Sequence, residues 1–231
     1  MTKRGHAYPG LWINFEAGEG AGKGTQQKML VKYLRDRRFV VNFGREPGTT
    51  LAGEQIRKLL QDPSLPNLNP KTEMLLYVAA GIEFFEQLAK PTLKRGGIFV
   101  TDRWRDSTRA YQGYGLGIDL RVIDILTVFS CDGAYPDITF LLDIDPGEGL
   151  SKITGYEFSG KRKKDKIEER EADYHARVNS GFREIARQNP DRFRVIPYME
   201  GNPNKMQQQI RKYVDGFLVE YDLENMLARV S

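Results

Sequence analysis

The stretch LWINFEAGEGAGKGTQQ, residues 11–27, decides the fold of this 231-residue chain. It begins with the apolar run 11–16, which predicts a buried strand, and continues into a turn with glycines at positions 18, 20, 22 and 24. Residues 25–38 then carry apolar side chains at helical spacing. Such a turn lets successive backbone N–H groups point at one anion, and the start of the helix adds a partial positive charge. The stretch therefore predicts a phosphate-binding loop.

This loop contains the residues expected to hold the phosphates of a nucleotide: Gly18, Glu19, Gly20, Ala21, Gly22, Lys23, Gly24 and Thr25. Lys23 supplies a full positive charge, and Thr25 supplies a hydroxyl close to a metal ion. The loop departs from GxxxxGK[ST], because Ala17 stands at the first glycine position and Gly24 stands where a serine or threonine usually holds magnesium. The GKGT variant resembles the loop of adenylate kinases, which implies that waters, phosphates and other carboxylates hold more of the magnesium. The alternative is a glycine-rich turn without a ligand.

Short apolar segments alternate with longer amphipathic ones along the rest of the chain. Strands are expected at 11–16, 39–43, 97–102, 137–144 and 192–197, and helices at 25–38, 51–62, 70–94 with a possible break at Gly81 or Pro91, 168–188 and 203–219. This alternation predicts an α/β fold, a five-stranded parallel sheet with helices on both faces. Ligands of such sheets bind at the carboxyl ends of the strands. No linker divides the chain, so residues 1–231 are expected to form a single domain.

Composition excludes several classes of protein. The 35 basic and 31 acidic residues give a formal net charge of +4, far from the excess of a nucleic-acid binder, so no nucleic acid is expected as a partner. The single cysteine, Cys131, excludes an internal disulfide and favours a reducing compartment, the cytoplasm. No apolar stretch approaches ~18 residues, so no membrane partner is expected.

Three further clusters accompany the loop: GREPGTT at 44–50, TEMLLYVAAGIEFF at 72–85 and TDRWRDSTRAYQGYG at 101–115. Together the four resemble the thymidylate kinase family, in which a phosphate-binding loop, an REPG turn, a helix ending in a pattern like LLFAADR, and a DR[YF]–DS–AYQG run occur in this order. The resemblance covers most of residues 11–190. It implies a P-loop NTPase fold, transfer of the γ-phosphoryl group of ATP to dTMP with Mg²⁺, which gives dTDP and ADP, and a homodimer.

The acceptor-binding residues implied by the resemblance are Arg45, Tyr77, Arg103, Tyr111 and Gln112. Arg45 follows a strand and precedes a rigid Pro-Gly turn, so its guanidinium can fork onto a phosphate. The alternative is a surface arginine paired with Glu46, which is otherwise expected to orient Arg45 or to cap nearby backbone. The family implies that Tyr77 stacks on the base, that Tyr111 lines the sugar, and that Gln112 hydrogen-bonds the base.

The catalytic residues expected beside Lys23 are Asp102 and Arg103 at the end of the third strand, and Glu19 in the loop. Asp102 is a metal ligand, directly or through water, together with Thr25, and Arg103 neutralises the acceptor phosphate. The alternatives are a plain Asp102–Arg103 ion pair and a solvated loop carboxylate at Glu19. Phosphoryl transfer between phosphates needs no general base, so His6 and His175 are expected to be surface or structural histidines.

One departure from the family concerns the base. The family pattern places Asp and then Arg where Gly81 and Ile82 stand, and that Arg usually hydrogen-bonds thymine. Ile82 cannot donate a hydrogen bond, so base recognition is shifted to Gln112 or Arg109, or it is aimed at another base. Two alternatives to a dTMP kinase follow: a kinase for another deoxynucleoside monophosphate, and a P-loop module that binds or hydrolyses a nucleotide.

The basic segment GYEFSGKRKKDKIEER, residues 155–170, is predicted to be a mobile lid over ATP, with approximate bounds 155–168. Arg162 and Lys164 are the expected lid cations, and Arg162 joins the catalytic set. The family often shows a D-R-x-E-like sequence here, for which this chain has Asp165-Lys166-Ile167-Glu168. The alternative is a solvated run of charges or the start of a helix.

Overall fold

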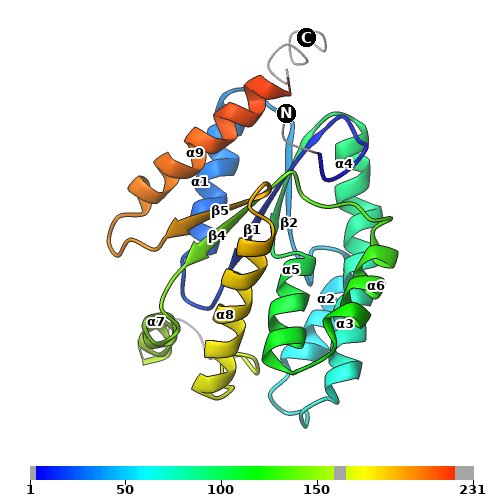
Figure 1. Ribbon diagram of the computed structural model, residues 1–231, viewed down its shortest axis with the longest axis vertical. Helices are drawn as coiled ribbons and strands as arrows, with labels where there is room; N and C mark the ends of the chain where they lie inside the picture. The colour runs from blue at the N-terminus through cyan, green and yellow to red at the C-terminus, as the bar shows by residue number, and fades with distance from the viewer. Residues whose placement is uncertain (1–3, 159–164, 222–231) are drawn as a thin grey trace.

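The computed structural model describes residues 4–158 and 165–221 of the chain. One sheet of five parallel strands forms its centre, in the order β2-β3-β1-β4-β5 (Figure 1). The strands are β1 Leu11–Ala17, β2 Val41–Arg45, β3 Ile98–Asp102, β4 Ile138–Asp143 and β5 Phe193–Pro197. The predicted α/β fold with a five-stranded parallel sheet is confirmed.

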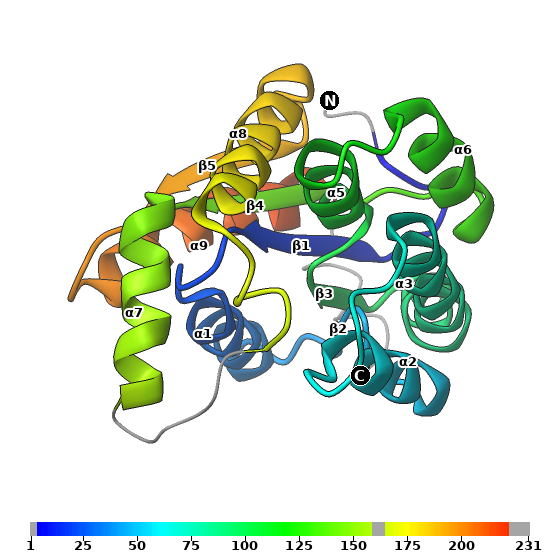
Figure 2. The same cartoon turned by 90° about the horizontal axis from the view of Figure 1, so that it is seen from below.

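Helices cover both faces of this sheet, as predicted: α1 and α9 lie on one side, and α3, α5, α6 and α8 on the other (Figure 2). The helical elements are α1 Lys23–Asp36, α2 Leu51–Gln61, α3 Pro70–Phe84, η1 Phe85–Ala89, α4 Lys90–Lys94, α5 Arg105–Thr108, η2 Arg109–Gly115, α6 Leu120–Ser130, α7 Pro146–Phe158, α8 Ala172–Gln188 and α9 Pro203–Glu220. Within the described part of the chain, none of them has the length and apolar character that crossing a membrane requires.

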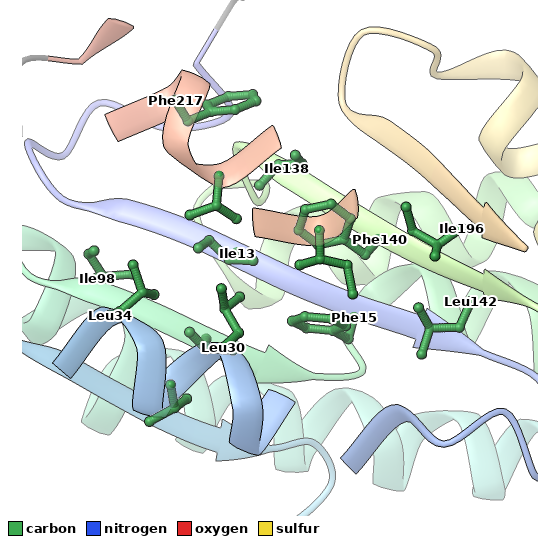
Figure 3. Close-up of a cluster of buried hydrophobic side chains, with 14 of the residues drawn as sticks. Ile13, Phe15, Leu30, Leu34, Ile98, Ile138, Phe140, Leu142, Ile196 and Phe217 are labelled. Atoms are coloured by element: carbon green, nitrogen blue, oxygen red, sulfur yellow. The ribbon is translucent and has the colours of Figure 1, made fainter. Parts of the chain in front are cut away.

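Side chains of β1 alternate between two separate parts of the core, as a strand buried on both faces requires. One set, Leu11, Ile13, Phe15 and Ala17, packs under α1 and α9 with side chains such as Leu30, Leu34 and Phe217 (Figure 3). On the opposite face, Trp12 packs against the aromatic rings of Phe85 and Trp104. Asn14 and Glu16 follow Trp12 on this second face and are fully buried. The second face thus changes from apolar to polar toward the carboxyl end of β1.

Two predicted boundaries differ in the structure. The second strand covers 41–45 rather than 39–43, because Phe39 closes the turn after α1 through its N–H to the Leu34 carbonyl. The shift places Arg45 inside the strand, level with Asp102 of β3. The helix expected over 70–94 is not broken at Gly81. It widens into η1 at Phe85, six residues before Pro91, whose ring has no N–H to offer the preceding turn.

Carboxyl ends of the three strands β1, β2 and β3 meet at one edge of the sheet. Asp102, the last residue of β3, lies between Phe15 of β1 and Arg45 of β2 in the strand register. The glycine loop after β1 and the turn after β2 therefore reach the same edge. Any group that these loops carry is brought next to Asp102.

Candidate active site

The glycine loop connects β1 to α1 in the geometry that its sequence predicts. Gly22, the residue before α1, has φ 74°, and Gly20 has φ 73°, a region that side chains with a β-carbon rarely adopt. At Gly20 a β-carbon would also lie only 2.3 Å from the carbonyl oxygen of Gly149 in α7. Gly24 and Thr25 lie in the first turn of α1. The loop and the helix start together present their N–H groups at the sheet edge.

A cavity of about 350 Å³, the large cavity, opens beside this loop at the carboxyl edge of the sheet. Its walls include most of the side chains predicted to act on a nucleotide: Glu19, Lys23, Arg45, Tyr77, Asp102, Arg103, Tyr111 and Gln112. Residues 44–48 and 102–112, far apart in sequence, are thereby brought together. Arg162 and Lys164, the expected lid cations, lie outside the described residues.

Asp102 forms an ion pair with Lys23 across the mouth of the glycine loop. Burial alone would raise the pKa of Asp102, but the positive charges of Lys23 and Arg103 outweigh burial and hold that pKa below its ordinary value. Asp102 is therefore a carboxylate at neutral pH. The plain Asp102–Arg103 ion pair considered as an alternative is not what the structure contains, because Arg103 turns to another partner.

That partner is Glu19, whose Oε1 accepts from Arg103 Nη2 at 3.0 Å and from the hydroxyl of Tyr111. Arg103 also donates to the Ala17 carbonyl at 2.8 Å, and its guanidinium lies 4.9 Å from the centre of the Tyr111 ring. Burial alone would raise the pKa of Glu19, but Arg103 and Tyr111 lower it by more, so its pKa lies below the ordinary value. Glu19 is not a solvated loop carboxylate. Arg103 holds this position with φ 69°, an uncommon backbone conformation for a residue other than glycine.

Beneath this cluster lies Glu16, which the sequence analysis missed. Its side chain is fully buried and accepts from the Trp104 N–H at 2.8 Å, the Ser107 hydroxyl at 2.5 Å and the Asn14 amide at 3.1 Å. Burial, followed by the charge of Asp106, raises the pKa of Glu16 to about 7. The signal in the sequence was the polar pair Asn14 and Glu16 on alternate positions of an otherwise apolar strand.

Arg45 pairs with Glu54 of α2 at 3.0 Å and not with Glu46, so the expectation that Glu46 orients it is wrong. Glu46 instead turns inward and is buried. A second guanidinium, that of Arg57 in α2, lines the same side of the large cavity. Burial and the nearby charge of Arg45 lower the pKa of Arg57. Arg57 was not predicted from the sequence, because nothing local distinguishes it from the exposed Lys58 beside it.

Gly81, not Ile82, faces the site. Tyr77 and Gly81 are one helical turn apart on α3, and both line a second space of about 10 Å³, the small cavity, whereas Ile82 lines neither cavity. The missing hydrogen-bond donor is therefore to be sought at Gly81, one position earlier than predicted. Of the two substitutes considered, Gln112 lines the large cavity, and Arg109 pairs with Asp124 away from it.

The segment 165–170 crosses the large cavity on the side of α2 and α3. Asp165 accepts from Gln61 of α2 at 2.8 Å, and Lys166 donates to the Pro66 carbonyl at 2.6 Å. Arg170 pairs with Glu73 of α3 at 2.6 Å, and the same carboxylate accepts from Gln112 at 3.0 Å. This described part of the predicted lid therefore covers the side of Arg45 and Tyr77, and Lys166 is an anchor.

The side chains of both histidines are buried, so both are structural histidines and neither is a surface histidine. His6 lies 3.0 Å from Asp137 at the far end of the sheet. His175 lies under Glu19, and burial lowers the pKa of its imidazole. Neither of them lines the large cavity.

Comparison with known proteins identifies the family. A family model described as thymidylate kinase matches residues 15–210. The chain belongs to the thymidylate kinase family. It is 41% identical over 193 residues to the thymidylate kinase of Roseiflexus sp. (strain RS-1), covering 80% of this chain and 85% of that one. With the thymidylate kinase of Roseiflexus castenholzii (strain DSM 13941 / HLO8) it shares 39% identity over 216 residues, covering 90% and 94%.

Among solved structures, the crystal structure of thymidylate kinase from Ehrlichia chaffeensis is similar to this one with a TM-score of 0.70. The two sequences are 34% identical, and the match covers 89% of this chain and 98% of that one. The family resemblance that the sequence motifs indicated is confirmed, and with it the P-loop NTPase fold. Membership in the family also makes this chain a phosphotransferase of the nucleoside monophosphate kinase class.

Proposed function

We propose that this protein transfers the γ-phosphoryl group of ATP to dTMP and forms dTDP and ADP. The observation that carries the proposal is the group of cations around the large cavity: Lys23 from the glycine loop, Arg45 and Arg57 from the opposite wall, and Arg103 between them. Two polyanions that meet end to end need positive charge on both sides of the junction. An arrangement with one loop lysine and three arginines meets that need.

The donor side of the site is the glycine loop. Its N–H groups and the first turn of α1 bind the phosphates of ATP, from Gly18 through Thr25, with Lys23 on the outer phosphates. The close contact of Gly20 with Gly149 supports a fixed loop shape. Arg162 and Lys164 remain the proposed lid cations on this side.

The acceptor side lies between α2, α3 and η2. Arg45 and Arg57 hold the monophosphate of dTMP, since two guanidiniums suit a dianion. Tyr77 stacks on the base, and Gln112 hydrogen-bonds it. Tyr111, whose hydroxyl is bound to Glu19, lines the sugar. The segment 165–170 closes over this side and keeps water out.

The residues present fit Mg²⁺, which is proposed as the metal. Asp102 is an ionised carboxylate at the sheet edge and Thr25 is a hydroxyl in the first turn of α1, both hard oxygen ligands. Within residues 4–158 and 165–221, no group of three or more acidic, histidine or cysteine side chains is present that could hold a metal. This suits an ion held by one or two protein oxygens and by substrate phosphates. Bound Mg²⁺ would neutralise charge on the β- and γ-phosphates of ATP.

Transfer proceeds in line and needs orientation more than proton chemistry. The attacking phosphate oxygen is already anionic near neutral pH, so no general base is required. Arg103 neutralises charge that develops between the two nucleotides. Its contacts with Glu19 and with the Ala17 carbonyl fix it beforehand, so little reorganisation accompanies the reaction.

A homodimer is proposed as the assembly. The outer face of α6 exposes Val122, Ile125 and Phe129, of which Ile125 is 70% and Phe129 75% exposed, and Leu75 of the neighbouring α3 is also exposed. A contiguous apolar face of this kind on two adjacent helices is typical of a subunit interface. The cytoplasm is the proposed location, since Cys131 is a buried free thiol.

The donor and acceptor assignments are tested by two variants in an ADP-release assay. Lys23→Ala should lower kcat by about 100-fold or more, as for loss of one transition-state contact. Arg45→Ala should lower kcat/KM for dTMP by about 30- to 150-fold, which corresponds to ~2–3 kcal/mol for a lost charged contact, with little change in the KM for ATP.

Arg187→Ala is the matched control, because Arg187 is an exposed arginine of α8 that does not line the large cavity. It should behave as the wild type. Near-normal turnover in Lys23→Ala would contradict the donor site. A rise of the KM for ATP in Arg45→Ala, with the KM for dTMP unchanged, would contradict the acceptor site.

A further inference from the structure

The small cavity behind Tyr77 carries unsatisfied polar groups. Three residues that line it, Glu46, Trp104 and Arg105, each have a buried atom without a hydrogen-bond partner: Glu46 Oε1, Trp104 Nε1 and Arg105 Nη2. All three side chains are at least nine-tenths buried. A buried polar atom left unpaired loses its hydrogen bonds to water without replacement, which is costly. Three unpaired polar atoms in the lining of one small cavity indicate that a polar group of a ligand enters it.

This small cavity adjoins the large one. Glu46, Tyr77 and Thr108 line both of them. A base stacked on Tyr77 would therefore have one edge directed either at the open cavity or at this inner space. Gly81 makes the inner space possible, because a β-carbon there would lie 3.9 Å from Glu46 Oε1 and 4.0 Å from the Trp104 ring.

The size of the small cavity limits what can enter. Its volume of about 10 Å³ is at the lower limit for a single water molecule. One exocyclic atom fits, and a further ring does not. The Trp104 indole and the Arg105 guanidinium can only donate hydrogen bonds, which favours an acceptor such as a carbonyl oxygen.

We propose that the small cavity receives the polar edge of the acceptor base and that Glu46 is the specificity-determining residue that hydrogen-bonds it. The preferred acceptor then carries a pyrimidine with a carbonyl oxygen on that edge. This inference rests on the proposed function, because it concerns the acceptor of the same reaction. The carboxyl group of Glu46 then recognises the base, which Gly81 cannot do because it has no side chain.

The state of Glu46 agrees with this role. Burial, followed by the charge of Glu16, raises the pKa of Glu46 to about 8, although Arg57 and Arg103 act in the opposite direction. Tyr77 also lies close to Glu46, and Arg105 lines the same small cavity. At neutral pH the carboxyl group is therefore mostly protonated. A protonated carboxyl both donates and accepts, and it can donate to a carbonyl oxygen.

The test compares variants that keep or remove the hydrogen-bonding group. Glu46→Leu should raise the KM for dTMP by about tenfold or more, equivalent to ~1.4 kcal/mol, whereas Glu46→Gln, which still donates and accepts, should stay within about threefold of the wild type. Gly81→Ala fills the small cavity with one methyl group and should raise the KM by about fivefold, equivalent to ~1 kcal/mol. Because alanine favours a helix interior over glycine, this second variant should keep the fold even if Glu46→Leu does not.

A readout that separates base recognition from a structural effect is inhibition by 2-deoxyribose 5-phosphate, an acceptor fragment without a base. Its inhibition constant and the KM for ATP should not change in any of these variants. Glu86→Leu, at an exposed position of η1, is the matched control. An unchanged KM for dTMP in Gly81→Ala, or an equal loss of dTMP and of the base-free fragment, would overturn the inference. Wild-type turnover of dTMP is measured separately, and its absence would instead refute the proposed function.

Discussion

Glu16 and Glu46 are two carboxyl groups buried close together beneath the cations of the large cavity. Their pKa values in the folded protein are raised to about 7 and about 8 from an ordinary 4.5, chiefly by burial. At pH values between the ordinary pKa of 4.5 and the raised pKa of each group, the native state keeps a proton that the unfolded chain has released. The stabilisation that these groups give is complete at low pH and is lost as the pH rises through the raised pKa values.

The free energy of unfolding should therefore fall as the pH rises from about 5 to about 8, by up to ~1.4 kcal/mol per pH unit for each such group. Glu46→Gln removes one of the two and should flatten the slope. Urea denaturation of both proteins at a series of pH values measures it. Parallel curves for wild type and variant would contradict the buried, protonated state of Glu46.

Residues at the carboxyl ends of strands were predictable from the sequence. Arg45 and Asp102 end β2 and β3, Arg103 follows β3, and Lys23 ends the loop after β1; parallel strands bring these ends to one edge. Arg57 was not predictable, because only the docking of α2 decides which of its polar side chains turns toward the cavity. Position 81 was predictable as well: the family pattern LLFAADR, set residue by residue on residues 75–81, puts its arginine at Gly81 and not at Ile82.

Among the elements, β2 and the segment 165–170 differ most from expectation. Local apolar pattern predicted β2 two residues early, since Phe39 and Val40 are as apolar as a strand requires, and only pairing with β3 sets the true register. In the segment 165–170, a run of charges gave no indication that Lys166 binds the chain between α2 and α3 and that Arg170 binds Glu73 of α3. Contacts between segments far apart in sequence decide both the register of β2 and the position of the segment 165–170.

The element that presents a testable apolar surface is α6. Ile125 and Phe129 lie one turn apart on its exposed face. If this face forms the homodimer, Ile125→Lys should shift the protein from dimer to monomer at micromolar concentration, because an unpaired charge would be buried in the interface. Sedimentation velocity measures the change. Lys212→Ala, at an exposed position of α9, should leave the assembly unchanged, and a wild-type protein that sediments as a monomer would refute the proposed dimer.

Across the whole molecule, alternation of strands and helices was enough to predict a parallel sheet covered on both faces. It was not enough to give the strand order β2-β3-β1-β4-β5, which depends on long-range packing. That order puts β1 in the middle, with its glycine loop between the ends of β3 and β4. The proposed donor side, which is the glycine loop, and the proposed acceptor side, between α2, α3 and η2, therefore meet at the sheet edge beside Asp102.

The most direct test of the account is an acceptor screen with the wild-type protein, ATP and Mg²⁺. ADP release is followed with dTMP, dUMP, dCMP and dGMP in turn, and the phosphorylated product is identified by mass. The account predicts stoichiometric ADP and dTDP with dTMP, at a kcat/KM at least about tenfold above that of every other acceptor, a difference of ~1.4 kcal/mol in transition-state binding. ADP release that does not depend on any acceptor, or a preference for another monophosphate, would contradict it.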